Sequence, residues 1–323
     1  VRPTDMFYSW LDLDRIEIPQ ADEQQRLLVN MLNFLGRDKR PLPRLWYFPA
    51  TSKSLLVATS DAHMNPAWAV EAIVSRVERF NGHISVYYLP PNYSLPRRAA
   101  LKARWWMWEK DIMDEPYLPT PIQVADWRAR GHEFGLHAIV GDGFEKGWKR
   151  FWNAFTGLGY GPVSPTSRVH RVLWDGWTES AKMQAEFGIR MNLDFYHVGD
   201  GFRKPNGEWV YGHFTGSGLP MKFIDGQGNI INIYQQLTHL ADDHILNLQW
   251  GGSVKIPAEQ AVDVSKALFD RSLAGGYAAI GAIFHTDPYA AGEEWANEAG
   301  KWIDGTMGYA VSKDIPIWSA EEW

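Results

Sequence analysis

The 323-residue sequence contains no cysteine, which excludes disulfide frameworks and thiolate metal sites. It has no apolar run of membrane-spanning length and no signal peptide at its start. It also lacks a basic stripe, and the formal net charge of −6 argues against a nucleic-acid surface. The absence of cysteine fits oxidising surroundings, so we expect an extracellular or cell-envelope location. The first residue is Val1, and we expect the chain to be one domain of a longer protein.

Aromatic residues are abundant, with 17 Trp, 13 Tyr and 15 Phe. A tryptophan ring fills a core well, and its flat face also suits stacking on sugar rings. Two tryptophans lie three residues apart, Trp174 and Trp177, and Tyr196 follows on a later predicted strand. We interpret these three as candidate sugar platforms, with packing at the start of a helix as the alternative.

From residue 53 onward, strand-like and helix-like segments alternate along the chain. This alternation predicts a parallel (β/α) barrel rather than an open sheet, with a Gly-rich hairpin insertion within residues 199–235. The first predicted strand covers residues 54–60. Later predicted elements include a helix over 144–157, a strand over 189–196 and a helix over 290–303. Residues 1–50 read as an N-terminal lead-in that packs on the barrel, which then occupies residues 51–323. The segment 90–118 is rich in proline and aromatics and reads as a long functional loop.

Polar side chains follow four predicted strands: Asp61 and His63, His137, Arg168 and His170, and His285. In a parallel barrel the carboxyl ends of the strands converge on one face. One histidine alone is more often a packed residue than a ligand, but four such strand ends are hard to explain as packing. The set predicts a site for zinc or a similar divalent metal with an open position for water. Asp242-Asp243-His244, by contrast, reads as a loop or helix end, because adjacent residues rarely converge on one ion.

These motifs resemble those of the NodB-type polysaccharide deacetylases. Gly131–His137 (G-H-E-F-G-L-H) matches their second motif, G-H-E-I-G-x-H, and is the most specific match. Thr59–Ala62 resembles their first motif, T-F-D-D, Arg168 their third, and Ile283–Asp287 their last. The chain is more similar still to a bacterial branch with T-G-D-D-H and R-x-H-x-x-x-W-x-x-W patterns. That resemblance spans nearly the whole chain, at Pro19–Leu28, Pro41–Tyr47, Thr59–His63, Arg168–Trp177 and Phe214–Met221.

The resemblance implies a distorted barrel of about seven strands and a role for each strand-end residue. Asp61 becomes the general base, Arg168 the residue that orients it, and His285 the general acid. The metal ligands become His137, with His170 in place of the second motif-two histidine, whose position holds Gly141 here.

Position 62 departs from the family pattern. The usual second aspartate, a metal ligand, is Ala62 here, and a methyl group cannot ligate a cation. Asp61 could shift to metal binding, His63 could complete the site, or the metal could be weak or absent. An engineered substitution would give the same sequence.

The leading hypothesis is a metal-dependent hydrolase that removes acetyl groups, through amide or ester bonds, from an acetylated glycan or oligosaccharide. Zinc is the expected metal. One alternative is a catalytically silent carbohydrate-binding barrel. A further alternative, a glycoside hydrolase, needs two carboxylates flanking the glycosidic bond. Asp194 is a weak candidate for the second carboxylate beside Asp61. We expect neither a nucleic-acid partner nor a membrane-spanning segment.

Overall fold

The computed structural model describes residues 11–39, 46–91, 118–248 and 252–323. Its strands are β1 (Leu55–His63), β2 (Ser85–Leu89), β3 (Glu133–Ala138), β4 (Thr166–Val169), β5 (Met191–Asn192), β6 (Met221–Ile224), β7 (Ile230–Gln235), β8 (Thr238–Ala241), β9 (Ala279–Ile283) and β10 (Ile317–Trp318). Its α-helices are α2 (Gln20–Gly36), α3 (Ala67–Glu78), α5 (Pro121–Ala129), α6 (Phe144–Gly157), α7 (Glu179–Glu186), α8 (Asp242–Ile245), α9 (Ala258–Arg271), α10 (Asp287–Ala291) and α11 (Glu293–Ser312). Three short turns join them, η2 (His170–Val172), η3 (Asp200–Phe202) and η4 (Ser272–Gly276). Most of the predicted functional loop 90–118 lies outside the described residues.

The central parallel strands form the predicted barrel. They follow the order β5-β4-β3-β2-β1-β9-β8, and each neighbouring pair along this path is parallel. The two ends of this series of strands meet at a parallel bridge between Tyr196 and Thr238, where the Thr238 N–H donates to the Phe195 carbonyl. The expected (β/α) barrel is therefore confirmed.

Side chains alternate along β1, and this alternation decides which of them reach the barrel interior. The inner core cluster contains two odd-numbered residues of the strand, Leu55 and Val57. The outer core cluster, which the helices cover, contains three even-numbered ones, Leu56, Ala58 and Ala62. Because β1 continues to His63, Asp61 and His63 face the interior and Ala62 faces the helices.

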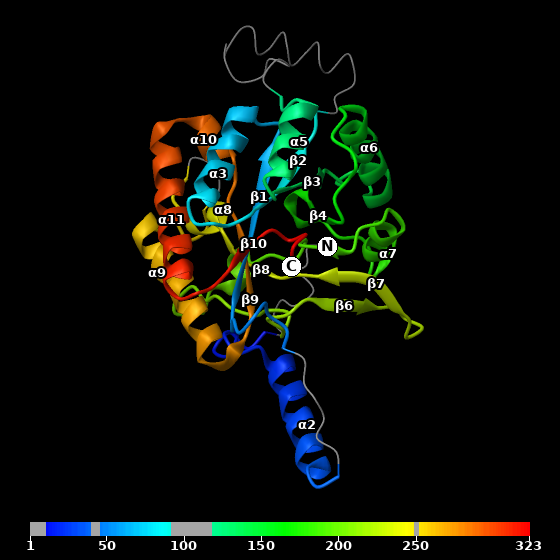
Figure 1. Cartoon of the computed structure of the whole chain (residues 1–323), viewed down its shortest axis with the longest axis vertical. Coiled ribbons are helices and arrows are strands. Elements are labelled where there is room, and N and C mark those ends of the chain that lie inside the picture. The colour runs from blue at the N-terminus through cyan, green and yellow to red at the C-terminus, as the bar shows by residue number, and fades with distance from the viewer. Residues whose placement is uncertain (1–10, 40–45, 92–117, 249–251) are drawn as a thin grey trace.

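The helices cover the outside of the barrel, as Figure 1 shows for α3, α5, α6 and α11. Their ends follow from local sequence. Thr120 caps α5 by accepting a hydrogen bond from the Gln123 N–H, and Pro121 occupies the first turn. Helix α6 occupies the predicted range 144–157 and buries Phe144, Trp148, Phe151 and Phe155, whose spacing places them on one face.

Several element bounds differ from the prediction. The strand predicted over 189–196 is only two residues long in β5. The helix predicted over 290–303 is two helices, because Gly292 has a φ of 144°, which other residues rarely adopt. The hairpin predicted within 199–235 is present as the antiparallel pair β6–β7, which adds to the β5 edge of the sheet.

The N-terminal lead-in contacts the barrel over only part of its length. Asp22, at the start of α2, is buried and accepts hydrogen bonds from the Ser217 hydroxyl (2.6 Å) and the Gly218 N–H (2.8 Å). Farther along, α2 points away from the barrel (Figure 1) and exposes the apolar residues Leu27, Leu28, Met31, Leu32, Phe34 and Leu35. The boundary between the N-terminal lead-in and the barrel at residue 50 stays a prediction. Within the described residues, no helix has the length and apolar character needed to span a membrane.

Candidate functional site

The strand-end histidines meet in one cluster. His63 ends β1, His137 lies on β3, and His170 follows β4 directly. The ring centroid of His63 lies 5.2 Å from that of His137 and 5.0 Å from that of His170. The ring centroids of His137 and His170 are 5.4 Å apart. His285, which follows β9, has its ring 5.4 Å from His63. The convergence expected at this end of the barrel is present.

Hydrogen bonds fix which nitrogen of each ring faces the cluster. His137 Nδ1 lies 2.9 Å from the Arg168 carbonyl, which can only accept, so Nδ1 carries the proton. His63 Nδ1 lies 2.8 Å from Asp287 Oδ2, which accepts in the same way. In the neutral form of each ring Nε2 then carries no proton, and within the described part of the chain both Nε2 atoms are buried without a hydrogen-bond partner. Two orphaned imidazole nitrogens in one cluster point to a bound cation.

Burial keeps two of these rings neutral. It lowers the pKa of His137 to about 3 and the pKa of His170 to about 4, and the nearby His63 adds to both effects. A neutral imidazole is the form that binds a metal.

The geometry of the three imidazoles also fits a metal. With Zn–N bonds of about 2 Å and tetrahedral angles, the centroids of two ligating rings lie roughly 5 Å apart. The three observed separations, 5.0, 5.2 and 5.4 Å, agree with this value. One ring nitrogen from each of His63, His137 and His170 lies within 4.8 Å of the other two. These residues therefore fit a divalent metal such as zinc.

Arg168 holds Asp61 beside this cluster. The guanidinium is fully buried and donates to Asp61 Oδ1 at 3.0 Å and to the hydroxyls of Thr59 and Thr238, each at 2.9 Å. The second Asp61 oxygen lies 3.8 Å from His137 Nε2. Burial alone would raise the pKa of Asp61, but the neighbouring cations Arg168 and His285 lower it below its usual range. Asp61 is therefore ionised, and Oδ2 makes no hydrogen bond to any described residue.

His285 is a charged imidazole. Its Nδ1 donates to Asp242 Oδ1 at 2.5 Å, and its backbone N–H donates to Asp242 Oδ2 at 2.7 Å. Burial opposes the charge, but the carboxylates of Asp242 and Asp243 raise the pKa of His285 well above its ordinary value. At neutral pH the ring thus presents a protonated Nε2.

The three predicted sugar platforms lie in different surroundings. Trp174 is 1% exposed and packs against Phe195 and Phe223, so the sugar-platform interpretation of this ring is wrong and the packing alternative holds. Trp177 is 66% exposed. Tyr196 is half-buried, and burial, Asp243 and Asp61 raise its pKa, which places it beside the cluster.

Sequence reasoning missed two functional carboxylates. Asp242 was interpreted as a loop or helix end, and it does begin the short helix α8, but it also binds His285. Asp287 begins α10 and binds His63. The usable signal was position, since each follows a strand or an adjoining turn at the same end of the barrel. Asp194 has both oxygens bonded, to the Val169 N–H and to Gln184.

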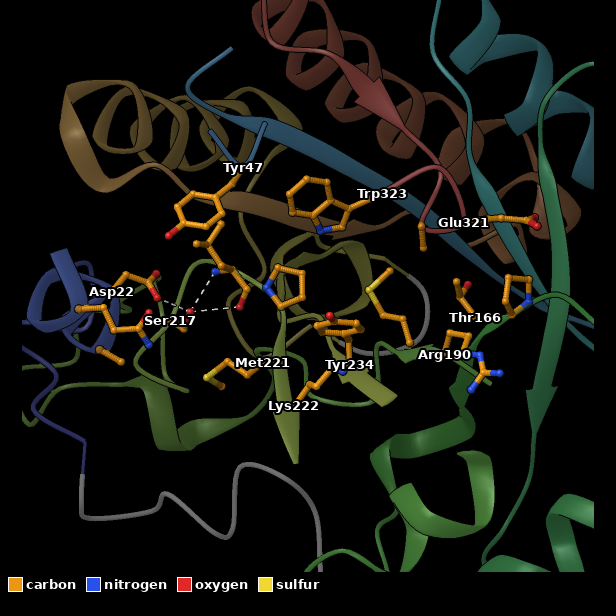
Figure 2. A pocket seen from close by; sticks show the side chains of 17 residues that line it. Asp22, Tyr47, Thr166, Arg190, Ser217, Met221, Lys222, Tyr234, Glu321 and Trp323 are labelled. Carbon is orange, nitrogen blue, oxygen red and sulfur yellow. Dashed lines mark hydrogen bonds between the residues drawn. The ribbon is translucent and has the colours of Figure 1, made fainter. Parts of the chain in front are cut away.

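A separate cavity lies at the opposite end of the strands. It measures about 940 Å³ and is lined by the first turn of α2, by the starts of β4 and β5, and by the C-terminal residues. Figure 2 shows Tyr47, Tyr234 and Trp323 around it, with Arg190 and Glu321 at one side. None of the clustered histidines lines this cavity, so its size does not make it the reactive site.

Comparison with known proteins identifies the fold. No protein-family model matches the sequence, and no curated protein matches it significantly. Among solved structures, a candidate polysaccharide deacetylase from Mycobacterium smegmatis matches with a TM-score of 0.55 and 13% identity, over 87% of this chain and 92% of that one. A family 4 carbohydrate esterase from Streptomyces lividans, solved with acetate, matches at a TM-score of 0.41 and 9% identity, over 81% and 91%, a likeness too loose to support an inference. The fold is that of the polysaccharide deacetylases.

Proposed function

We propose that this chain is a metal-dependent hydrolase that removes acetyl groups from a carbohydrate. The observation that carries the proposal is the convergence of Asp61 and four imidazoles, those of His63, His137, His170 and His285, at one end of the barrel. An ionised carboxylate, Asp61, and a protonated imidazole, His285, lie beside neutral imidazoles with free nitrogens. Hydrolysis of an acyl bond needs a base for the water, an acid for the leaving group and a stabiliser for the oxyanion.

Each residue has a role in this scheme. A divalent metal, when bound at the imidazoles, would polarise the acyl carbonyl and acidify the attacking water. Asp61 accepts the proton of that water through Oδ2, while Arg168 holds Oδ1 and keeps the carboxylate in place. His285 gives its Nε2 proton to the leaving amine or alkoxide as the carbon–nitrogen or carbon–oxygen bond breaks. Asp242 keeps that proton on the ring beforehand.

The substrate class rests on the fold and on the sequence resemblance together. Both indicate an acetylated glycan or oligosaccharide, with an amide or ester linkage to the acetyl group. Exposed Trp177 offers one ring for stacking on a sugar. We also propose zinc as the metal and an extracellular or cell-envelope location in a bacterium, in keeping with the absence of cysteine.

The silent carbohydrate-binding barrel is the second candidate, and Ala62 is the observation that favours it. The glycoside hydrolase loses support, because both oxygens of Asp194, the candidate partner of Asp61, are hydrogen-bonded within the protein.

The direct test is acetate release from N-acetylated chito-oligosaccharides and from O-acetylated xylan, with and without added zinc. The proposal predicts zinc-dependent release from at least one of them, lost in Asp61→Asn and in His285→Gln. Asp304→Asn is the matched control, since the ion-pair partners of Asp304 among the described residues are Arg76 and Arg79 and not the clustered histidines. Glycan binding without acetate release from any acetylated sugar would establish the silent barrel instead.

A further inference from the structure

The alternation of β1 settles which of its last residues can reach a metal. Ala62 is fully buried in the outer core cluster, and its partner in the strand register is Tyr88, which belongs to the same cluster. A side chain at position 62 therefore points toward the helices. Asp61 and His63 point the other way, and the position that the family pattern reserves for a metal ligand is on the wrong face here.

His63 faces the cluster and is built to stay there. Its Nδ1 donates to Asp287 Oδ2 at 2.8 Å, and its backbone N–H donates to Asn65 Oδ1 at 2.6 Å. Asn65 is itself fixed, since the same oxygen accepts from the Thr286 hydroxyl at 2.6 Å and its amide lies 3.4 Å from Asp287 Oδ1. Asp287, which lies 224 residues away in the sequence, thus fixes the tautomer of His63. It leaves Nε2 buried, with no hydrogen-bond partner among the residues that the structure describes.

We propose that His63 is the third metal ligand, displaced by one residue from the usual aspartate, and that Asp287 is the positioning residue that makes it one. This inference rests on the proposed metal-dependent function. The metal is then held by three imidazoles, from His63, His137 and His170, and Asp61 remains unligated as the base. Asp287 supplies, behind the imidazole, the negative charge that a direct carboxylate would otherwise bring to the site.

The ligand set has a consequence for metal choice. Three imidazole nitrogens suit zinc, cobalt, nickel or copper, whereas magnesium, calcium and manganese favour oxygen ligands. Since Asp61 is bonded to Arg168 on one oxygen, it offers at most one oxygen ligand to a hard cation. Zinc and cobalt should bind far more tightly than magnesium or manganese.

The experiment is a metal-binding titration that does not depend on activity. The full chain is stripped with a chelator and titrated with zinc against a chromophoric competitor, and with cobalt, whose visible absorption reports tetrahedral coordination. The wild type should bind one zinc and give the tetrahedral cobalt spectrum. His63→Ala should weaken zinc binding at least about 100-fold, and Asp287→Asn by about 10–100-fold, the range for lost carboxylate partners of ligating histidines. Asp304→Asn should leave both readouts unchanged.

The outcomes separate this inference from the proposed function. If the wild type binds no zinc, the metal-dependent function fails. If the wild type binds zinc and His63→Ala binds it equally well, the function stands and the three-imidazole site is refuted. Circular dichroism of each stripped variant checks the fold. Should Asp287→Asn be unfolded, His63→Ala and His63→Gln decide the matter, because neither removes a buried charge.

Discussion

Replacing Ala62 with aspartate separates two explanations of this position. If Ala62 marks a lost metal ligand, Ala62→Asp restores the ligand, tightens metal binding and raises activity. If the side chain faces the outer core, as the strand alternation shows, the new carboxylate meets only apolar neighbours. We expect the second result, with no gain in bound metal and a large loss of stability.

The size of that loss follows from the ionisation of the new group. An aspartate has an ordinary pKa of about 3.9, so holding it neutral in an apolar core at pH 7 costs about 4 kcal/mol. Total unfolding free energies of globular proteins are about 5–15 kcal/mol. The cost falls to below about 1 kcal/mol at pH 4.5, which lies only about 0.6 units above the ordinary pKa of the carboxyl group.

Ala62→Asn is the matched control, because it adds nearly the same volume and polarity without a titratable charge. Urea unfolding, followed by tryptophan fluorescence, gives the unfolding free energy of both variants between pH 4.5 and 7.5. Their difference should grow with pH to about 4 kcal/mol at pH 7. A pH-independent difference, or an additional bound zinc in Ala62→Asp, would refute the outward orientation of residue 62.

Three further predictions concern single residues. Burial raises the pKa of Glu133 to about 7 from 4.5. The protonated carboxyl group therefore stabilises the folded state below pH 4.5, and this contribution, about 3 kcal/mol, is lost as the pH rises through 7. In urea unfolding, Glu133→Gln should remove this pH dependence of the unfolding free energy, and Glu186→Gln, at an exposed position, should not. Asp242→Asn removes a negative charge that raises the pKa of His285. In the pH profile of the acetate-release rate, the alkaline limb should therefore move to lower pH by about one unit or more. An unshifted profile would mean that Asp242 has only a structural role. Trp177→Ala should raise KM with stability unchanged to within about 0.5 kcal/mol, while buried Trp174→Ala should cost about 3–5 kcal/mol; equal stability losses would contradict the assigned burial.

The sequence was sufficient for the barrel and for the convergence of its histidines, because both depend on local signals. Apolar runs ending in a polar residue mark strand ends, and parallel strands bring those ends together. The sequence did not show which way the side chain at position 62 points, for a physical reason. The predicted strand stopped at residue 60, which left positions 61–63 without a defined face, whereas β1 continues to His63. A strand three residues longer imposes alternation and turns Ala62 outward.

Long-range pairing hid the two positioning carboxylates. Asp242 meets His285 across 43 residues and Asp287 meets His63 across 224, and neither contact leaves a local pattern. The strand before Asp242 is only four residues long, too short to show a period. Trp174 was ambiguous for a related reason, since the ring's burial depends on Phe195 and Phe223 of distant segments.

The charge states of the cluster are set by groups outside it, and this explains how a base and an acid persist side by side. Asp61 and His285 would exchange a proton if nothing else held them, because each neutral form is the ordinary outcome of burial. Arg168, itself held by Thr59 and Thr238, keeps the carboxylate ionised, and Asp242 keeps the imidazole protonated. The Arg168 carbonyl meanwhile fixes the neutral tautomer of His137. Arg168 thus contributes its side chain to the base and its backbone carbonyl to a metal ligand. Because replacement removes only the side chain, an Arg168 variant should impair proton transfer while the carbonyl still fixes the tautomer of His137.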